Sequence, residues 1–341
     1  MPTFQDWLDS PKSPKNPQEH QQLRLETIRE IERLTSRPLI VYAGKTRGGG
    51  FSVPNAIDDS DITGFSDLIE GISGPFLDVL LHSPGGSAEA TERIVNLLRA
   101  NFSHIRFLIP HSAYSAATML AFSGNEILMD ERSTLGPIDP QIIIATPQGT
   151  TVAPVEEILD GFAKVRQILK DEPGALGAYL PMLQKYDLHI FETCENAKNL
   201  AKNLAEAWLR DYMLADVPDA AGKAVDVVER FASHSENLSH GRTIGIKKAT
   251  EWGLRVRDLR ASPDLRQALW KLYVLVEIYF DRTPAVKLFE NSRGVSWART
   301  HREIQLVPIP SLPESGALPP AGPPRGNPQP RSSKKKHKRH R

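Results

Sequence analysis

Two short segments of the sequence combine residues that could carry out acyl transfer. Ser115 lies in PHSAYSAATML, residues 110–120, directly after the apolar, β-branched stretch IRFLI. Gly85 and Gly86 lie in LLHSPGGSAEA, residues 80–90. Glycines present backbone N–H groups without interference from a Cβ, here just before a helix whose dipole favours negative charge. An oxyanion hole is built from such N–H groups.

Ser115 also has a simpler, structural interpretation. A serine followed by Ala-Ala-Thr-Met-Leu is an ordinary way to begin a helix, because its hydroxyl can cap free backbone amides. The chemical interpretation requires the two segments to follow neighbouring strands. In that case the Ser115 hydroxyl and the amides of Gly85 and Gly86 converge on one point.

The elements around these segments follow the pattern of an α/β protein. Buried-strand patterns are expected at 38–43, 76–82, 105–109 and 126–129, and helices at 62–72, 87–100 and from about 115. Alternating strands and helices at this spacing predict crossover units on a parallel sheet. Further helices are expected at 21–35, 154–170 and 186–214, and a helix, a glycine stop and a strand at 245–256. The glycine-rich turn at 44–50 lacks the spacing of a phosphate-binding loop.

The composition is that of a globular protein with one main domain and appendages. The chain has 341 residues, of which 40% are hydrophobic and 24% charged. The N-terminus lacks the pattern of a signal peptide, and no stretch approaches the roughly 18 apolar residues of a membrane span. The single cysteine, Cys194, allows neither an internal disulfide nor a cysteine-based zinc site. We therefore expect a cytoplasmic protein.

The C-terminal tail differs in composition from the rest of the chain. It is rich in proline beyond about residue 303, and residues 331–341 carry seven lysines and arginines without an acidic residue. Because the net charge is +1, the remainder of the chain has a net charge of −6. A segment of this kind buries too little apolar surface to fold. We expect a disordered tail that could bind nucleic acid or an acidic partner.

Four blocks of sequence, taken in order, resemble a known family. They are LLHSPGG (80–86), PHSAYSAATMLAFSGNEILMD (110–130), STLGPIDPQ (133–141) and SHGRTIGIKKATEWGLRV (239–256). The chain resembles the Clp protease/crotonase superfamily, its signal peptide peptidase A-like branch, and the serine dehydrogenase proteinase group within that branch. The resemblance covers roughly residues 36–260, and the order of the blocks makes it more specific than any single motif.

The resemblance implies a fold, a domain organisation and an activity. The fold is α/β, a Clp protease/crotonase-like spiral of βαβ units with an N-terminal helical arm and a disordered C-terminal tail. The corresponding boundaries are an arm at 1–35, a peptidase domain at 36–302 and a tail at 303–341. The implied activity is that of a serine peptidase, without a cofactor, that acts on peptide or unfolded protein as a homo-oligomer.

The resemblance also assigns roles to residues in the two turns. It makes Ser115 the nucleophile and the amides of Gly86 and Ala116 the oxyanion donors, while Gly85 shapes the turn. The segment LGPIDPQ resembles one that lines the substrate channel. Within it, Asp139 is either a chemical group or part of a turn set by glycine and proline.

A serine hydroxyl needs a base, and both Ser/His/Asp and Ser/Lys arrangements occur in this superfamily. His82 and His111 flank the two turns, although histidines in such positions are often structural, with the ring bonded to a nearby carbonyl. His240 lies in a block that the family shares. Lys164 points away from the apolar face of the helix at 154–170, so we expect it to be solvated.

The helix at 186–214 contains another candidate base. Its apolar stripe has spacings of three and four residues and is formed by Phe191, Cys194, Lys198, Ala201, Ala205, Trp208 and Tyr212. Lys198 either extends along the edge of this stripe into water or holds its amine in an apolar cleft. In a cleft, desolvation favours the neutral amine, which could take the Ser115 proton. Related sequences carry a lysine close to this position.

Two alternative functions use the same fold. The chain could be a non-catalytic scaffold that binds peptide or another macromolecule. It could also be a crotonase-like acyl-CoA enzyme, which would use the oxyanion hole on a thioester enolate and would not need Ser115. A lone serine beside two amide donors favours the peptidase.

Overall fold

The computed structural model describes residues 16–46, 54–146, 149–184, 186, 189–233 and 243–301. Within these residues the central sheet has the strand order β10-β5-β3-β2-β1-β11-β12. Its strands are β1 (Leu39–Gly44), β2 (Phe76–His82), β3 (His104–Leu108), β5 (Glu126–Met129), β10 (Val256–Asp258), β11 (Ala285–Asn291) and β12 (Ser296–Thr300). The first five in chain order are parallel, whereas β11 and β12 run antiparallel. The sheet is thus mixed, and its parallel strands are those that the sequence predicts.

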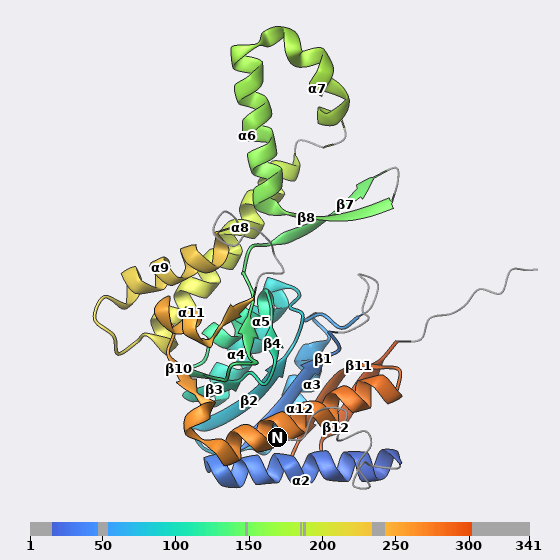
Figure 1. Ribbon diagram of the computed structural model, residues 1–341, viewed down its shortest axis with the longest axis vertical. Helices are drawn as coiled ribbons and strands as arrows, with labels where there is room; N and C mark the ends of the chain where they lie inside the picture. Colours follow the sequence, from blue (N-terminus) through green and yellow to red (C-terminus); the bar gives the residue numbers. More distant parts are fainter. Residues whose placement is uncertain are drawn as a thin grey trace, which may run out of the picture. The chain divides into compact units, whose positions relative to one another are not determined.

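Helices cover both faces of this sheet (Figure 1). The α-helices of the described residues are α2 (Pro17–Thr35), α3 (Asp61–Ile69), α4 (Ala88–Asn101), α5 (Ala116–Phe122), α6 (Val155–Asp171), α7 (Leu176–Leu183), α8 (His189–Trp208), α9 (Ala220–Ala232), α11 (Ile246–Glu251) and α12 (Pro263–Arg282). Of these, α6 and α7 extend away from the sheet (Figure 1). A π-helical turn, Leu209–Met213, continues α8, and 3₁₀ turns occur at Pro173–Ala175 and Leu259–Ala261. The predicted α/β fold is confirmed.

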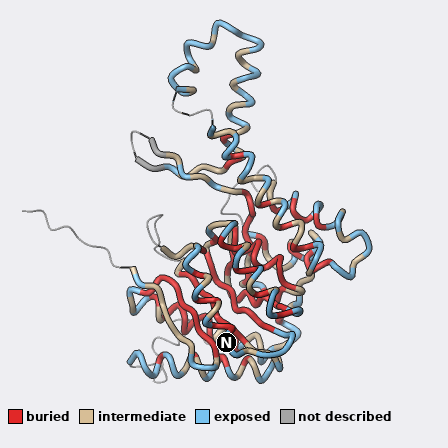
Figure 2. The backbone as a smooth tube through the Cα atoms, turned by 180° about the vertical axis from the view of Figure 1, so that it is seen from behind, coloured by how far each residue is buried: buried red, intermediate tan, exposed pale blue. Residues whose placement is uncertain are grey.

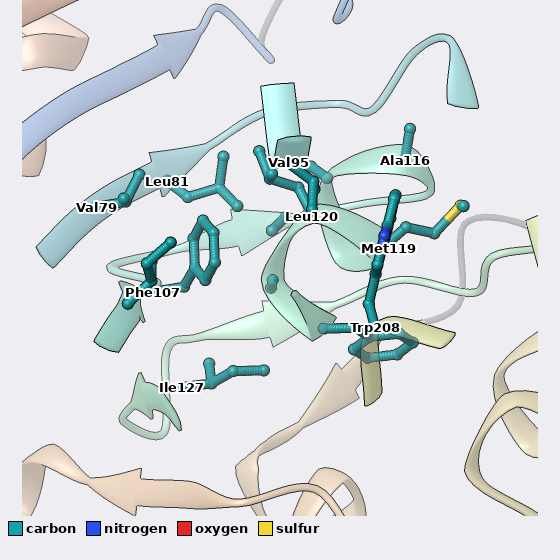
Figure 3. Packing of buried hydrophobic residues seen from close by; sticks show 14 of the residues in the cluster. Val79, Leu81, Val95, Phe107, Ala116, Met119, Leu120, Ile127 and Trp208 are labelled. Atoms are coloured by element: carbon teal, nitrogen blue, oxygen red, sulfur yellow. The ribbon is translucent and has the colours of Figure 1, made fainter. Parts of the chain in front are cut away.

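Alternation along the strands produces two separate hydrophobic clusters, because successive strand residues point to opposite faces. Leu39, Val41 and Leu80 belong to the cluster that includes residues of α2 and α12. Phe107 belongs to the larger cluster on the other face, which includes residues of α3, α4, α5, α8 and α9. Figure 2 shows the inner strands of the sheet as largely buried, whereas the edge strands β10 and β12 are intermediate or exposed. Figure 3 shows Phe107 in the larger cluster.

Helix α2 forms where the sequence predicts a helix, and its buried stripe includes polar and charged residues. Its buried residues are His20, Arg24, Thr27, Ile28 and Ile31, whereas Leu34 is exposed. An arginine can lie inside this stripe because the Arg24 guanidinium donates two hydrogen bonds, of 2.7 and 2.6 Å, to the Glu290 carboxylate of β11. Figure 1 shows α2 and α12 side by side.

Smaller sheets complete the fold. Strands β4 (Ser112–Ala113), β6 (Thr134–Leu135) and β9 (Ile244–Gly245) form a three-stranded sheet, and β7 (Gln141–Thr146) pairs with β8 (Gly149–Pro154) as a hairpin. Helices α6 and α8 share a small cluster around Val155, Ile158 and Cys194. In Figure 2 the α6–α7 segment is largely exposed or intermediate.

Parts of the predicted organisation lie outside the described residues. These parts are His240, the glycine-rich turn at 47–50, the first fifteen residues and the tail from 302 onward, including the basic run at 331–341. The described residues fall in one compact unit, Met1–Arg302. Within them, no helix combines the length and apolar character required to cross a membrane.

The buried histidine of α2 predicts a specific pH dependence of stability. Burial, together with the charges of Arg24 and Arg282, lowers the pKa of His20 from 6.5 to about 4. The unfolded chain therefore binds a proton at a higher pH than the native protein does, so stability falls as pH decreases from about 6.5 to 4. Between pH 7.5 and 5 this histidine alone should lower the free energy of unfolding by about 2 kcal/mol.

Urea unfolding at the two pH values measures this contribution. His20→Gln should reduce the difference in unfolding free energy between pH 7.5 and 5 by about that amount. His104→Gln, which alters an exposed histidine, should leave the wild-type difference in place. An unchanged difference in His20→Gln would show that His20 takes up its proton equally in the folded and unfolded states.

Candidate active site

The glycine turn and the serine turn lie against each other. Strand β2 ends at His82 and is followed by the glycine turn, and β4 leads directly into the serine turn. The Ser83 N–H donates to the Ser112 carbonyl at 3.1 Å, and the Tyr114 N–H donates to the Ser83 carbonyl at 3.1 Å. Because β2 and β3 are parallel neighbours, the segments after them meet at one edge of the sheet. This juxtaposition is the one that the chemical interpretation requires.

Ser115 has a strained backbone and does not cap the helix that follows it. Its φ of 50° and ψ of −122° lie in a region that L-residues rarely adopt. Its side chain makes no capping hydrogen bond to α5, so the simpler structural interpretation of this serine is wrong. The residue is half-buried at the start of α5. A sharp, strained turn from strand to helix is the arrangement that exposes a nucleophilic serine hydroxyl in other hydrolases.

Gly85 allows the two turns to approach closely. Its φ is 103°, and a Cβ at this position would lie 2.7 Å from the Ser115 Cβ and 2.6 Å from the Tyr114 carbonyl oxygen. Its own N–H is directed to the Ser83 hydroxyl at 3.2 Å. Gly85 therefore shapes the turn, and its amide is already used within it.

Two other backbone amides lie at this point, those of Gly86 and Ala116. Among the described residues, neither the N–H of Gly86 nor that of Ala116 donates a hydrogen bond. Ala116 is the first residue of α5, where backbone N–H groups lack a partner within the helix. Gly86 and Ala116 both line the pocket that contains Ser115. Two such donors beside a serine can stabilise an oxygen that becomes negatively charged.

The pocket itself has a volume of about 220 Å³ and a mostly small or apolar lining. It is lined by Gly86, Ser87, Ala88, Glu89, Ser115, Ala116, Met119, Ile138, Pro140, Gln141, Ala197, Leu200 and Ala201. Glu89 is the titratable group in this set, and its carboxylate accepts a hydrogen bond of 2.8 Å from the Ser87 hydroxyl. The lining thus combines apolar side chains with the polar side chains of Ser87, Glu89 and Gln141.

The LGPIDPQ segment packs directly against the serine turn. The Gly136 N–H donates to the Ala113 carbonyl at 3.1 Å, and the Thr118 hydroxyl donates to the Gly136 carbonyl at 3.0 Å. A Cβ on Gly136 would lie 2.7 Å from the Tyr114 ring. Asp139 is buried between the pocket residues at 138 and 140. The segment thus forms one wall of the pocket.

Lys198 forms an ion pair with Glu156. Its ammonium lies 2.9 Å from one carboxylate oxygen of Glu156 and 3.1 Å from the other. The two side chains are 28% and 32% exposed, so this pair is not enclosed in an apolar cleft. The neighbouring residues Ala197 and Ala201, rather than Lys198, line the pocket. Lys198 would therefore have to leave Glu156 to reach the serine.

The other candidate bases are placed differently. The His82 Nδ1 lies 3.1 Å from the Ser112 carbonyl, and its Nε2 lies 3.2 Å from the Thr46 hydroxyl. The His111 ring stacks on Tyr273, with centroids 5.1 Å apart. The His82 Nε2 also lies 3.6 Å from the Glu277 carboxylate. Among the described residues, neither histidine lines the pocket that contains Ser115. Lys164 is exposed on α6, as its helical position predicts.

No group of three or more histidine, cysteine, aspartate or glutamate side chains in the described ranges could hold a metal ion. At Ser115 the structure combines a serine hydroxyl with the backbone amides of Gly86 and Ala116. This combination supports nucleophilic acyl transfer.

The structure shows further residues at the candidate active site that the sequence patterns do not reveal. The backbone of Ile57 lies against Gly86, and its N–H donates to the Gly85 carbonyl at 2.7 Å. On α8, the small residues Ala197 and Ala201 let the helix approach the pocket. Their spacing of four residues is visible in the sequence, but only the packing shows which face of the helix meets the serine turn.

Comparison with known proteins places this chain among peptidases. A family model described as "ClpP-like SDH-type serine proteinase" matches residues 18–229. An uncharacterized protein of Methanocaldococcus jannaschii is 28% identical over 204 residues, covering 56% of this chain and 67% of that protein. A second uncharacterized protein of the same organism is 28% identical over 234 residues, covering 60% and 73%.

Two solved structures are also similar. A serine-to-alanine mutant of the 1510-N membrane-bound stomatin-specific protease is 14% identical, with a TM-score of 0.39, and the match covers 62% of this chain and 79% of that one. An asparagine-to-aspartate mutant of ClpP1 from Listeria monocytogenes is 12% identical, with a TM-score of 0.34, and the match covers 72% and 98%.

The backbone strain at Ser115 should lower the free energy of unfolding, and two substitutions at this position test this. Glycine adopts the Ser115 dihedral angles without steric cost, whereas alanine retains the strain. Relief of such strain is worth about 1–3 kcal/mol, and the greater unfolded-state entropy of glycine offsets up to about 1 kcal/mol of it. Ser115→Gly should therefore unfold at a higher urea concentration than Ser115→Ala. Equal midpoints, or a lower one for glycine, would show that the turn is not strained.

Proposed function

The chain belongs to the family of ClpP-like SDH-type serine proteinases, and from this membership we propose that it hydrolyses peptide bonds through an acyl-enzyme on Ser115. The observation that carries the proposal is the strained, uncapped serine in one pocket with the free amides of Gly86 and Ala116. A catalytic serine requires this combination of an accessible hydroxyl and preorganised donors. The site thus supports a serine endopeptidase that acts on peptide or unfolded protein.

The reaction follows from these positions. The Ser115 oxygen attacks the carbonyl carbon of the peptide while a base takes the hydroxyl proton. The carbonyl oxygen becomes negatively charged and accepts hydrogen bonds from the Gly86 and Ala116 amides. The protonated base then donates its proton to the leaving amine, and the bond from the carbonyl carbon to the amine nitrogen breaks. Water hydrolyses the resulting ester and releases Ser115.

Two residues compete for the role of base. Lys198 lies on α8, beside residues that line the pocket, although it is paired with Glu156. His240 lies outside the described residues, between α9 and β9. We propose Lys198 as the base, because the residues before and after it on α8, Ala197 and Ala201, line the pocket that contains Ser115. His240 remains the alternative.

A fluorophosphonate probe, which reacts with activated serines, tests the function directly. The wild-type protein should be labelled and should hydrolyse a fluorogenic peptide, and Ser115→Ala should lose both properties. Ser66→Ala, which alters a serine bonded to the Ile62 carbonyl outside the pocket, should retain both. A folded wild-type protein without labelling would instead support a non-catalytic scaffold. Turnover of an acyl-CoA thioester that survives Ser115→Ala would support the crotonase-like alternative.

The identity of the base is tested by breaking the Lys198–Glu156 pair from each side. Lys198→Ala should abolish both turnover and labelling, because no amine remains to take the serine proton. Glu156→Gln should keep most of the activity, because it removes only the partner of Lys198. Lys164→Ala and His240→Ala should also keep most of it.

Two other outcomes would contradict the lysine assignment. If Lys198→Ala and Glu156→Gln lowered activity equally, the pair would be structural. If Lys198→Ala stayed active while His240→Ala was inactive, the base would be a histidine.

A further inference from the structure

The orientation of the Gly86 amide depends on one neighbouring segment. The carbonyl of Gly85 and the N–H of Gly86 belong to the same planar trans peptide unit, so they point in opposite directions. The Ile57 N–H donates to this Gly85 carbonyl at 2.7 Å. The bond therefore fixes the direction of the Gly86 N–H, away from Ile57. A Cβ on Gly86 would lie 2.2 Å from the Ile57 carbonyl oxygen, so the two backbones are in direct contact.

The next peptide unit along the same segment is held in the same way. The Ile57 carbonyl accepts a hydrogen bond of 2.9 Å from the Ser87 N–H, just after the glycine turn. The other end of this peptide unit, the Asp58 N–H, donates to the Asp61 carboxylate at 3.2 Å. Asp61 thus holds the backbone that in turn holds the glycine turn.

Asp61 is fixed by a buried lysine from a distant part of the chain. The Lys287 ammonium lies 2.7 and 2.8 Å from the two carboxylate oxygens of Asp61 and 2.9 Å from the Asp58 carboxylate. Lys287 and Asp61 are both fully buried. The Tyr42 hydroxyl adds a hydrogen bond of 2.7 Å to Asp61. Without the lysine, this carboxylate would be a buried charge without its neutralising cation.

The ionisation states fit this arrangement. Burial and the Asp61 charge raise the pKa of Tyr42 well above its ordinary value, so the phenol remains a donor. Partial burial acts to raise the pKa of Asp58, but hydrogen bonds from Ser60 and Lys287 outweigh it and leave that pKa below its ordinary value. Burial raises the pKa of Asp61, against the opposing effect of the Lys287 charge. The Arg299 guanidinium also contacts the cluster, 3.2 Å from the Asp58 carboxylate.

We propose that Lys287 is a positioning residue for the oxyanion hole, acting through Asp61 and the Ile57–Asp58 backbone on the Gly86 amide. The proposal rests on the proposed function, in which Gly86 donates to the oxyanion. Lys287 lies on β11, beyond the residues 18–229 that the family model matches. The C-terminal part of this chain thus contributes to the geometry of a site formed by the matched part.

The chain contains a matched control for the loss of a buried ion pair. Arg24 and Glu290 are each 3% exposed and lie 2.6 Å apart, and Glu290 is on the same strand as Lys287. This pair joins α2 to β11. Breaking either pair should cost comparable stability, because each leaves a buried carboxylate without its cation. Only the loss of Lys287 should disturb the glycine turn.

The experiment compares Lys287→Met and Arg24→Met in the full chain, at a temperature where circular dichroism shows both to be folded. With a fluorogenic peptide, Lys287→Met should lower kcat by about 10- to 100-fold and leave KM within about twofold, since misplacing a catalytic group by about 1 Å can cost about 100-fold. Arg24→Met should leave both constants near wild type. Equal kcat values in the two variants would overturn the proposal.

Two further measurements keep the result interpretable. If Lys287→Met does not fold, Asp58→Asn removes one of the carboxylate contacts, and it should lower kcat by about 3- to 10-fold with an unchanged KM. An unchanged kcat in that variant would also overturn the proposal.

Labelling of wild-type protein by a fluorophosphonate separates the proposed peptidase function from the positioning role of Lys287. An unlabelled wild type contradicts the proposed function, whereas a labelled, active wild type with fully active Lys287→Met contradicts the positioning role alone.

Discussion

The hydrogen bond from the Ile57 N–H to the Gly85 carbonyl constrains the peptide unit that carries the Gly86 amide. The amide points away from Ile57, because the carbonyl at the other end of the same rigid unit is held toward Ile57. A glycine is required at 86 because any Cβ would collide with the Ile57 backbone. The site therefore depends on a backbone contact that no catalytic side chain supplies.

The rest of the fold holds the serine turn against this amide. Parallel pairing of β2 and β3 brings the glycine and serine turns to the same edge, and hydrogen bonds between Ser83 and its partners Ser112 and Tyr114 join them. Gly85 and Gly136 permit the close approach on either side of Tyr114. The strained backbone conformation of Ser115 is held by contacts on both sides of the turn. Such conformations persist only where the surrounding structure enforces them.

The parts of this arrangement that could be predicted from the sequence are those encoded by local patterns. Apolar strands such as 76–82, the glycine turn and the serine turn each occupy a short segment, and the two turns meet if the strands before them are neighbours. The cluster of Lys287, Asp61, Asp58 and Tyr42 could not be predicted in this way. Lys287 lies in the strand AVKLFEN, where a lone lysine would normally be expected to reach water, and its partner Asp61 is 226 positions away. Arg24 on α2 is buried for the same reason, since Glu290 neutralises it across the fold. Likewise, periodicity places Lys198 on the apolar stripe of α8, but only the packing of α6 shows that Glu156 pairs with it.

A structure of the protein with a peptide aldehyde, whose reaction with a catalytic serine forms a tetrahedral adduct, tests the central claim most directly. We predict a covalent bond to the Ser115 oxygen, with the adduct oxygen about 2.7–3.1 Å from the backbone nitrogens of both Gly86 and Ala116. An adduct on another residue would contradict it, as would an adduct on Ser115 whose oxygen points away from the Gly86 amide.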